Sequence, residues 1–109
     1  MSGVRGEDSL KEDAYFKKLA KLRIEAEQCR TQSKKLSKNN QQDESAKFQA
    51  KAEIIEMKIK RTCDKLAVHS GQLKDKECYY LAMGKMEKAE TVAKRIKAIN
   101  KKIKEYQKI

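Results

Sequence analysis

The chain has 109 residues and a formal net charge of +11, with 27 lysines or arginines against 16 aspartates or glutamates. This length fits one domain and excludes a multidomain enzyme. Four glycines and no proline argue against a fold rich in β-structure or loops. The longest apolar run, from Cys78 to Met83, is too short to span a bilayer, and the N-terminus lacks the apolar core of a secretory signal.

The cysteines predict a reducing compartment. They are isolated and odd in number, at Cys29, Cys63 and Cys78. A secreted disulfide scaffold is usually shorter, richer in cysteine and even in count. We therefore expect a cytoplasmic or nuclear protein.

The first predicted helix covers about residues 9–38. Residues 1–8 contain two glycines and no apolar period, so we expect a flexible tail there. Ser9 and Glu12 then have the spacing of a capping box. Apolar residues follow at alternating spacings of four and three, which predicts one buried helical face. This first stripe, broken only by Ser33, consists of Tyr15, Leu19, Leu22, Ala26, Cys29, Ser33 and Leu36.

The second predicted helix covers about residues 44–69. Asparagines at 39 and 40 tolerate the left-handed conformation that ends a helix, and Asp43 or Ser45 can cap the next one. Ser70 and Gly71 predict the end, because glycine is favoured just beyond a helix C-terminus. The second stripe consists of Phe48, Ala52, Ile55, Ile59, Thr62 and Leu66, widened by Met57, Cys63 and Ala67.

The third predicted segment covers about residues 74–109. Gly84 is either tolerated inside one long helix, at about 1 kcal/mol, or separates a short helix over 74–83 from a long one over 85–109. The break is favoured because the shorter C-terminal helix matches the second helix in length. The third stripe consists of Val92, Ile96, Ile99, Ile103 and Tyr106, with Tyr79, Ala82, Met86 and Ala89 upstream.

Short connections between apolar stripes predict an all-α fold, an up-down-up three-helix bundle with coiled-coil-like packing over residues 9–109. The same spacing suits an oligomeric coiled coil, so self-association is the alternative. Residues 82–89, with Ala93 and Ile96, resemble the middle of one tetratricopeptide repeat, in which an alanine five residues after a glycine packs two helices together. The pattern occurs once, and such repeats need three copies to bury a core, so we assign no family.

No catalytic or metal-binding pattern is present in the sequence. His69 is the single histidine, and the nucleophile elbow, the phosphate-binding loop and the zinc-binding helix motif are all missing. Zinc sites usually pair cysteines two to four residues apart, unlike the three isolated cysteines here. His69, near the predicted end of the second helix, fits a structural role at the negative end of the dipole. We predict a non-enzymatic protein without cofactor or metal.

The last predicted helix carries a row of lysines on one face. Five lysines recur there at spacings of three and four, opposite the third stripe, and Glu105 is the one acidic residue among them. A row of one sign attracts polyanions. However, 22 of the 27 basic residues are lysine, whereas arginine provides the bidentate fork suited to phosphate. The row consists of Lys94, Lys97, Lys101, Lys104 and Lys108.

These features predict a protein-interaction module, a small adaptor or assembly subunit that binds an acidic protein partner. The lysines would steer association, and Ile103, Tyr106 and Ile109 would be exposed anchors if the third helix extends beyond its neighbours. The alternative is an RNA- or ribosome-associated protein that uses the basic face of the C-terminal helix.

Overall fold

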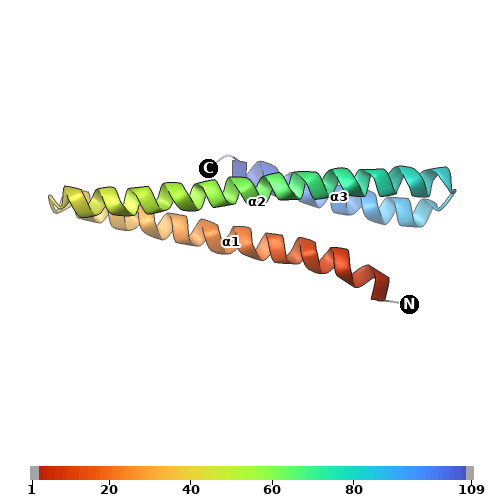
Figure 1. The fold of residues 1–109 in the computed structure, drawn as a ribbon, viewed down its shortest axis with the longest axis horizontal. Coiled ribbons are helices and arrows are strands. Elements are labelled where there is room, and N and C mark those ends of the chain that lie inside the picture. Colours follow the sequence, from red (N-terminus) through yellow and green to blue (C-terminus); the bar gives the residue numbers. More distant parts are fainter. Residues whose placement is uncertain (1–2, 108–109) are drawn as a thin grey trace. The chain divides into compact units, whose positions relative to one another are not determined.

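A computed structural model describes the backbone of residues 3–107 and the side chains of residues 11–107. This part of the chain forms three α-helices and no strand (Figure 1). They are α1 (Gly3–Lys38), α2 (Gln42–Ala82) and α3 (Met86–Gln107). The pairs α1·α2 and α2·α3 pack together, which confirms the predicted all-α three-helix bundle. None of these helices has a stretch apolar enough to cross a bilayer.

The helices form two compact units, and α2 contributes to both. In one unit, residues 13–38 of α1 pair with residues 42–62 of α2. In the other, residues 63–82 of α2 pair with α3, and the start of α1, up to Glu12, joins them. Each unit buries its own apolar residues: Leu19, Leu22, Ala26, Ala52 and Ile59 in the first, and Cys63, Leu66, Leu73, Ala89, Val92, Ile99 and Tyr106 in the second.

The predicted stripes identify the packed faces of the helices. Every member of the first stripe and of the six-residue second stripe is buried or half-buried, as are all five residues from Val92 to Tyr106. The additions to the stripes were less accurate. Met57 is 57% exposed, and Tyr79 and Met86, upstream on the third segment, are 59% and 64% exposed.

The turn between α1 and α2 forms where asparagine predicted it. Asn40 has a φ of 60°, and the N–H of Gln41 donates to the carbonyl of Leu36 at 2.8 Å. This is the bond of a Schellman motif, which satisfies a carbonyl at the helix end. The predicted cap at Asp43 or Ser45 is wrong, because α2 begins at Gln42 and both residues lie inside it. The side chain of Ser45 has another role. Its hydroxyl donates instead to the carbonyl of Ser33 at 2.8 Å, which joins the two helices.

The second turn forms at Gly84, which confirms the break there. Gly84 has a φ of +76°, and the N–H of Lys85 donates to the carbonyl of Tyr80 at 2.8 Å. The predicted helix end at Ser70 and Gly71 is wrong, because α2 continues to Ala82. Leu73 is only 1% exposed, so its burial keeps the chain packed just beyond Gly71, where the helix was expected to end. Residues 74–83 are therefore the last turns of α2 and not a separate short helix.

The start of α1 also differs from the prediction. The helix already includes residues 3–8, which were expected to form a tail, and Ser9 lies inside it. Glu12 therefore does not complete a capping box. Its carboxylate pairs with His69 on α2 and with Arg95 on α3. These contacts bind the start of α1 to the unit formed by α2 and α3.

Candidate interaction surfaces

The predicted lysine row lies on the outside of α3. Lys94, Lys97, Lys101 and Lys104 are all exposed, and they recur opposite the buried stripe of the same helix. Lys108 lies outside the described residues. The four described lysines form one positively charged face.

Nearby acidic groups do not neutralise this row. Glu105, the acidic residue of this stretch, lies 3.9 Å from the ammonium of Lys102, which is outside the row. The guanidinium of Arg95 is paired with Glu12. The row therefore keeps a single sign along three turns of helix, which raises the local positive potential.

The described anchor residues predicted near the C-terminus are not exposed. Tyr106 is 8% exposed and Ile103 is half-buried, while Ile109 lies outside the described residues. The prediction required α3 to extend beyond its neighbours, but its last described turns are packed like the rest of the stripe. Tyr106 is therefore a core residue.

Exposed apolar side chains gather instead at the turn between α2 and α3. Tyr79, Leu81, Met83 and Met86 are between 47% and 64% exposed. We call these four residues the hairpin tip. They make up half of the eight large apolar residues that are exposed among the described side chains. The sequence did not predict the exposure of the hairpin tip, because the spacing placed Tyr79 and Met86 on a buried face. Their position beside the Gly84 turn was visible.

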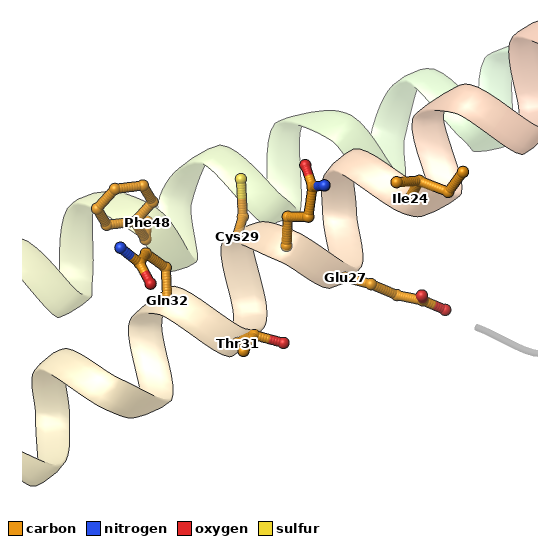
Figure 2. Close-up of a pocket in the computed structure, with 7 residues that line it drawn as sticks. Ile24, Glu27, Cys29, Thr31, Gln32 and Phe48 are labelled. Atoms are coloured by element: carbon orange, nitrogen blue, oxygen red, sulfur yellow. The ribbon is translucent and has the colours of Figure 1, made fainter.

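The unit formed by α1 and α2 has a shallow hollow of about 560 Å³ on one side. Figure 2 shows Ile24, Cys29 and Gln32 of α1 and Phe48 of α2 along it, while Glu27 points away from α2. The ammonium of Lys51 lies 5.0 Å from the centre of the Phe48 ring. Amide, hydroxyl, thiol and apolar groups line the hollow, and Glu27 is the one charged residue in its lining.

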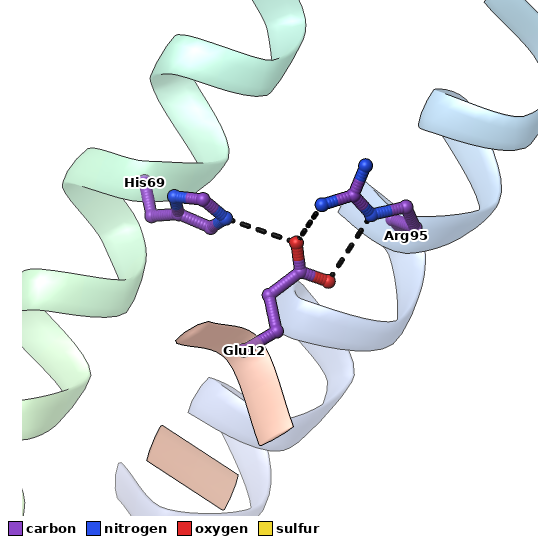
Figure 3. Close-up of polar contacts among 3 residues, drawn as sticks. All are labelled: Glu12, His69 and Arg95. Carbon is purple, nitrogen blue, oxygen red and sulfur yellow. Dashed lines mark hydrogen bonds and ion pairs between the residues drawn. The ribbon is translucent and has the colours of Figure 1, made fainter. Parts of the chain in front are cut away.

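Glu12, His69 and Arg95 form a buried polar cluster, which Figure 3 shows between three helical segments. His69 Nε2 lies 2.9 Å from Glu12 Oε2, and Arg95 donates from Nε to Glu12 Oε1 at 3.3 Å and from Nη2 to Glu12 Oε2. The side chains of Glu12 and His69 are each 8% exposed. Because both carboxylate oxygens already accept hydrogen bonds inside the fold, the cluster fits a structural role better than acid–base catalysis.

His69 therefore has a partner that the sequence did not reveal. It was predicted near the end of a helix, where the dipole would favour its charge, yet it lies well inside α2. Its partner Glu12 is 57 residues away in the chain, and the contact depends on tertiary packing. The only sequence signal was a polar residue at a position where the apolar stripe should continue.

The three cysteines differ in burial. Cys63 is buried, Cys29 is half-buried and Cys78 is exposed, and all three are free thiols. Burial, followed by the nearby carboxylate of Asp64, raises the pKa of the Cys63 thiol. Over the described side chains, no three histidine, cysteine, aspartate or glutamate residues come together in a geometry that could hold a metal ion.

Comparison of the chain with protein families, with curated proteins and with solved structures found no match.

Proposed function

We propose that this protein is a non-enzymatic helical interaction module that binds an acidic protein partner. The observation that carries the proposal is the hairpin tip, where four large apolar side chains are exposed within eight residues of sequence. Large exposed apolar side chains close to one turn suggest an interaction site, although Tyr79 and Leu81, two positions apart on α2, point to opposite sides of the helix. Tyrosine and methionine are also enriched in the centres of protein interfaces.

The net charge supports the acidic character of the partner. The chain carries +11, and the lysine row is exposed along α3, the helix that begins at the hairpin tip. Charge of one sign speeds the encounter with an oppositely charged protein and disfavours partners of like charge, while apolar contacts hold the complex. The apolar side chains of the hairpin tip would thus hold the partner in the complex, and the lysines would speed its association.

A matched pair of double variants tests the proposal. Tyr79→Ser with Met83→Ser removes two tip side chains that are 59% and 55% exposed. Ile54→Ser with Met57→Ser removes two that are 55% and 57% exposed in the other unit. Proteins captured from nuclease-treated extract by the wild type and by the control variant, but not by the tip variant, are candidate partners.

The affinity of a purified candidate decides the outcome. We expect an acidic protein whose binding weakens by roughly tenfold or more in the tip variant, as for an interface anchor, and stays unchanged in the control. Titration calorimetry measures both values. Equal affinity of the two variants for every captured protein would contradict the proposal.

The lysine row favours RNA binding as a second candidate function. If its four described lysines contact phosphates of single-stranded RNA, log Kd should change with log salt with a slope of about 3. Anisotropy of a labelled 20-nucleotide RNA measures this slope. Lys97→Gln with Lys101→Gln should roughly halve it, while Lys58→Gln with Lys60→Gln serves as the control. RNA binding that is absent at low salt would remove this candidate.

A further inference from the structure

The pair formed by α2 and α3 presents two sides to possible neighbours, and the start of α1 lies on one of them. His69 and Arg95 mark that side, with Glu12 between them (Figure 3). Two residues further along a helix the side chain points about 200° away, to the opposite side. Gly71 and Lys97 therefore mark the second side, where a groove of about 530 Å³ runs between the helices.

This α2/α3 groove has a mostly apolar floor, and each helix contributes one lysine to its rim. Its floor consists of Ala67, Gly71, Ala93 and Ile96. Lys74 and Lys97 stand at the rim, one on each helix, while Glu77 is half-buried farther along α2. At one end the hydroxyl of Ser70 donates to Asn100 Oδ1 at 3.2 Å and ties the helices together. The small floor residues would let another backbone approach closely.

The face of the groove continues at both ends. On α2, residues 71, 74, 78 and 81 recur at spacings of three and four, so Leu81 lies on the same face as Gly71. On α3, residues 86, 90, 93 and 97 do the same, which places Met86 there. Leu81 and Met86 belong to the hairpin tip and are 47% and 64% exposed. Toward the turn this face carries Cys78, Leu81 and Met86 together with the acidic Glu90, and it is basic from Lys97 onward.

We infer that the α2/α3 groove binds an amphipathic helix from another protein, with an apolar face on the groove floor and acidic residues beside Lys74 and Lys97. The chain contains a precedent on the opposite side, where a helical glutamate, Glu12, pairs with Arg95 of α3. An amphipathic helix in an apolar groove is a common mode of recognition. The inference rests on the proposed function and specifies the site and the form of the partner.

Charge and the apolar floor favour an acidic amphipathic helix over two other possible occupants of the groove, a second copy of the chain and a nucleic acid. A second copy would bring another +11 toward a basic rim, and repulsion between the copies would oppose its binding. A nucleic acid would use the lysines but would leave the apolar floor without a complementary group. An acidic amphipathic helix uses both the rim and the floor.

A selection experiment tests the inference without a known partner. The probe is a displayed library of helices with leucine and alanine on one face and glutamate, lysine or glutamine allowed beside it. It is selected on the full chain at near-physiological salt. We expect enrichment of glutamate over lysine, and Kd values for the enriched peptides that rise by roughly tenfold or more in Gly71→Phe and in Lys97→Glu.

Two variants serve as matched controls. A Cβ built at Gly71 meets nothing within 4 Å, so Gly71→Ala should bind like the wild type, whereas Gly71→Phe places a ring in the groove. Lys65→Glu makes the same charge change as Lys97→Glu, at an exposed residue of α2 outside the groove lining. Circular dichroism confirms that each variant is folded.

Each other outcome overturns the inference. It fails if no peptide is enriched, if lysine or glutamine is enriched instead, or if neither Gly71→Phe nor Lys97→Glu weakens binding. A dimer in sedimentation that Gly71→Phe converts to a monomer would assign the groove to a second copy. Peptides lost in the variant with Tyr79→Ser and Met83→Ser, but kept in Gly71→Phe, would support the proposed function while rejecting the groove as the site.

Discussion

The contact among Glu12, His69 and Arg95 shows how a few polar side chains hold the helices of one unit together. Glu12 belongs to the first turns of α1, and its two partners come from α2 and α3. A buried carboxylate is tolerated only when it is paired and hydrogen-bonded, and here a guanidinium and an imidazole supply the partners. The start of α1 thus joins the unit of α2 and α3 through a specific polar contact.

Removal of the Glu12 charge should therefore destabilise the fold. Glu12→Gln leaves the partly buried guanidinium of Arg95 without a counter-charge, and we expect a loss of about 2 kcal/mol or more in the free energy of unfolding. Glu27→Gln is the control, because Glu27 is 69% exposed in an i,i+4 pair with Arg23 and should change stability by less than about 0.5 kcal/mol. Urea unfolding followed by circular dichroism measures both. Equal losses would refute a specific role for Glu12.

The three thiols should react in the order of their exposure. Cys78 is exposed, Cys29 is half-buried and Cys63 is buried. Because the thiolate is the reactive species, the raised pKa of Cys63 lowers its reactive fraction at pH 8 and shifts its reaction to higher pH. We expect a disulfide reagent to modify Cys78 first and Cys63 last, with mass spectrometry assigning each site. In urea the three rates should converge, and a fast native reaction at Cys63 would contradict its burial.

At the level of elements, Gly71 within α2 and Gly84 in the turn after it have opposite effects on stability. Gly84 has a φ of +76°, a conformation that a side chain disfavours, whereas Gly71 lies within α2, where glycine lowers helix stability. We expect Gly84→Ala to destabilise the protein by about 1 kcal/mol or more, and Gly71→Ala to stabilise it by about 0.5 to 1 kcal/mol. Thermal unfolding of both variants measures the signs. A shift in the same direction would contradict these opposite roles.

The same glycines show how far the sequence could predict the elements. The spacing of apolar residues identified three helices and their packed faces, and Asn40 and Gly84 supplied the turns. The prediction failed at residues 69–71, because two polar residues and a glycine looked like a helix end. His69 and Ser70 are buried and hydrogen-bonded to Glu12 and Asn100, and these partners lie 57 and 30 residues away in the chain. Local pattern cannot reveal such pairs.

The candidate site was predictable only in part. The lysine row follows from spacing alone, since lysines opposite an apolar stripe must face solvent. The hairpin tip does not, because Tyr79 and Met86 match the buried spacing and are exposed only by their place beside the turn. The groove along α2 and α3 depends on how α2 pairs with α3, and its signal was the small residues Ala67, Gly71 and Ala93.

For the molecule as a whole, burial is concentrated away from the two turns. Over the described side chains, no residue between Leu73 and Ala89 is buried, and between Ala26 and Ala52 only Ser45 is. Residues 52–73 of α2, by contrast, contain eight buried side chains, including Leu66 and Leu73. Segments with few buried contacts open more readily than the core, and binding surfaces are commonly drawn from them.

Hydrogen exchange should therefore divide α2 along its length. We expect amides in residues 59–73 to exchange roughly 100-fold more slowly than those in residues 76–82, although both segments belong to one unbroken helix. Mass spectrometry of peptic fragments measures the two rates, and exchange of the urea-unfolded chain supplies the reference. Uniform protection along α2 would mean that the hairpin tip is as stable as the core. Slow exchange at residues 76–82 that becomes faster in Tyr79→Ser with Met83→Ser would show that these apolar side chains stabilise the turn. The hairpin tip would then be part of the folded core and not a surface available for binding.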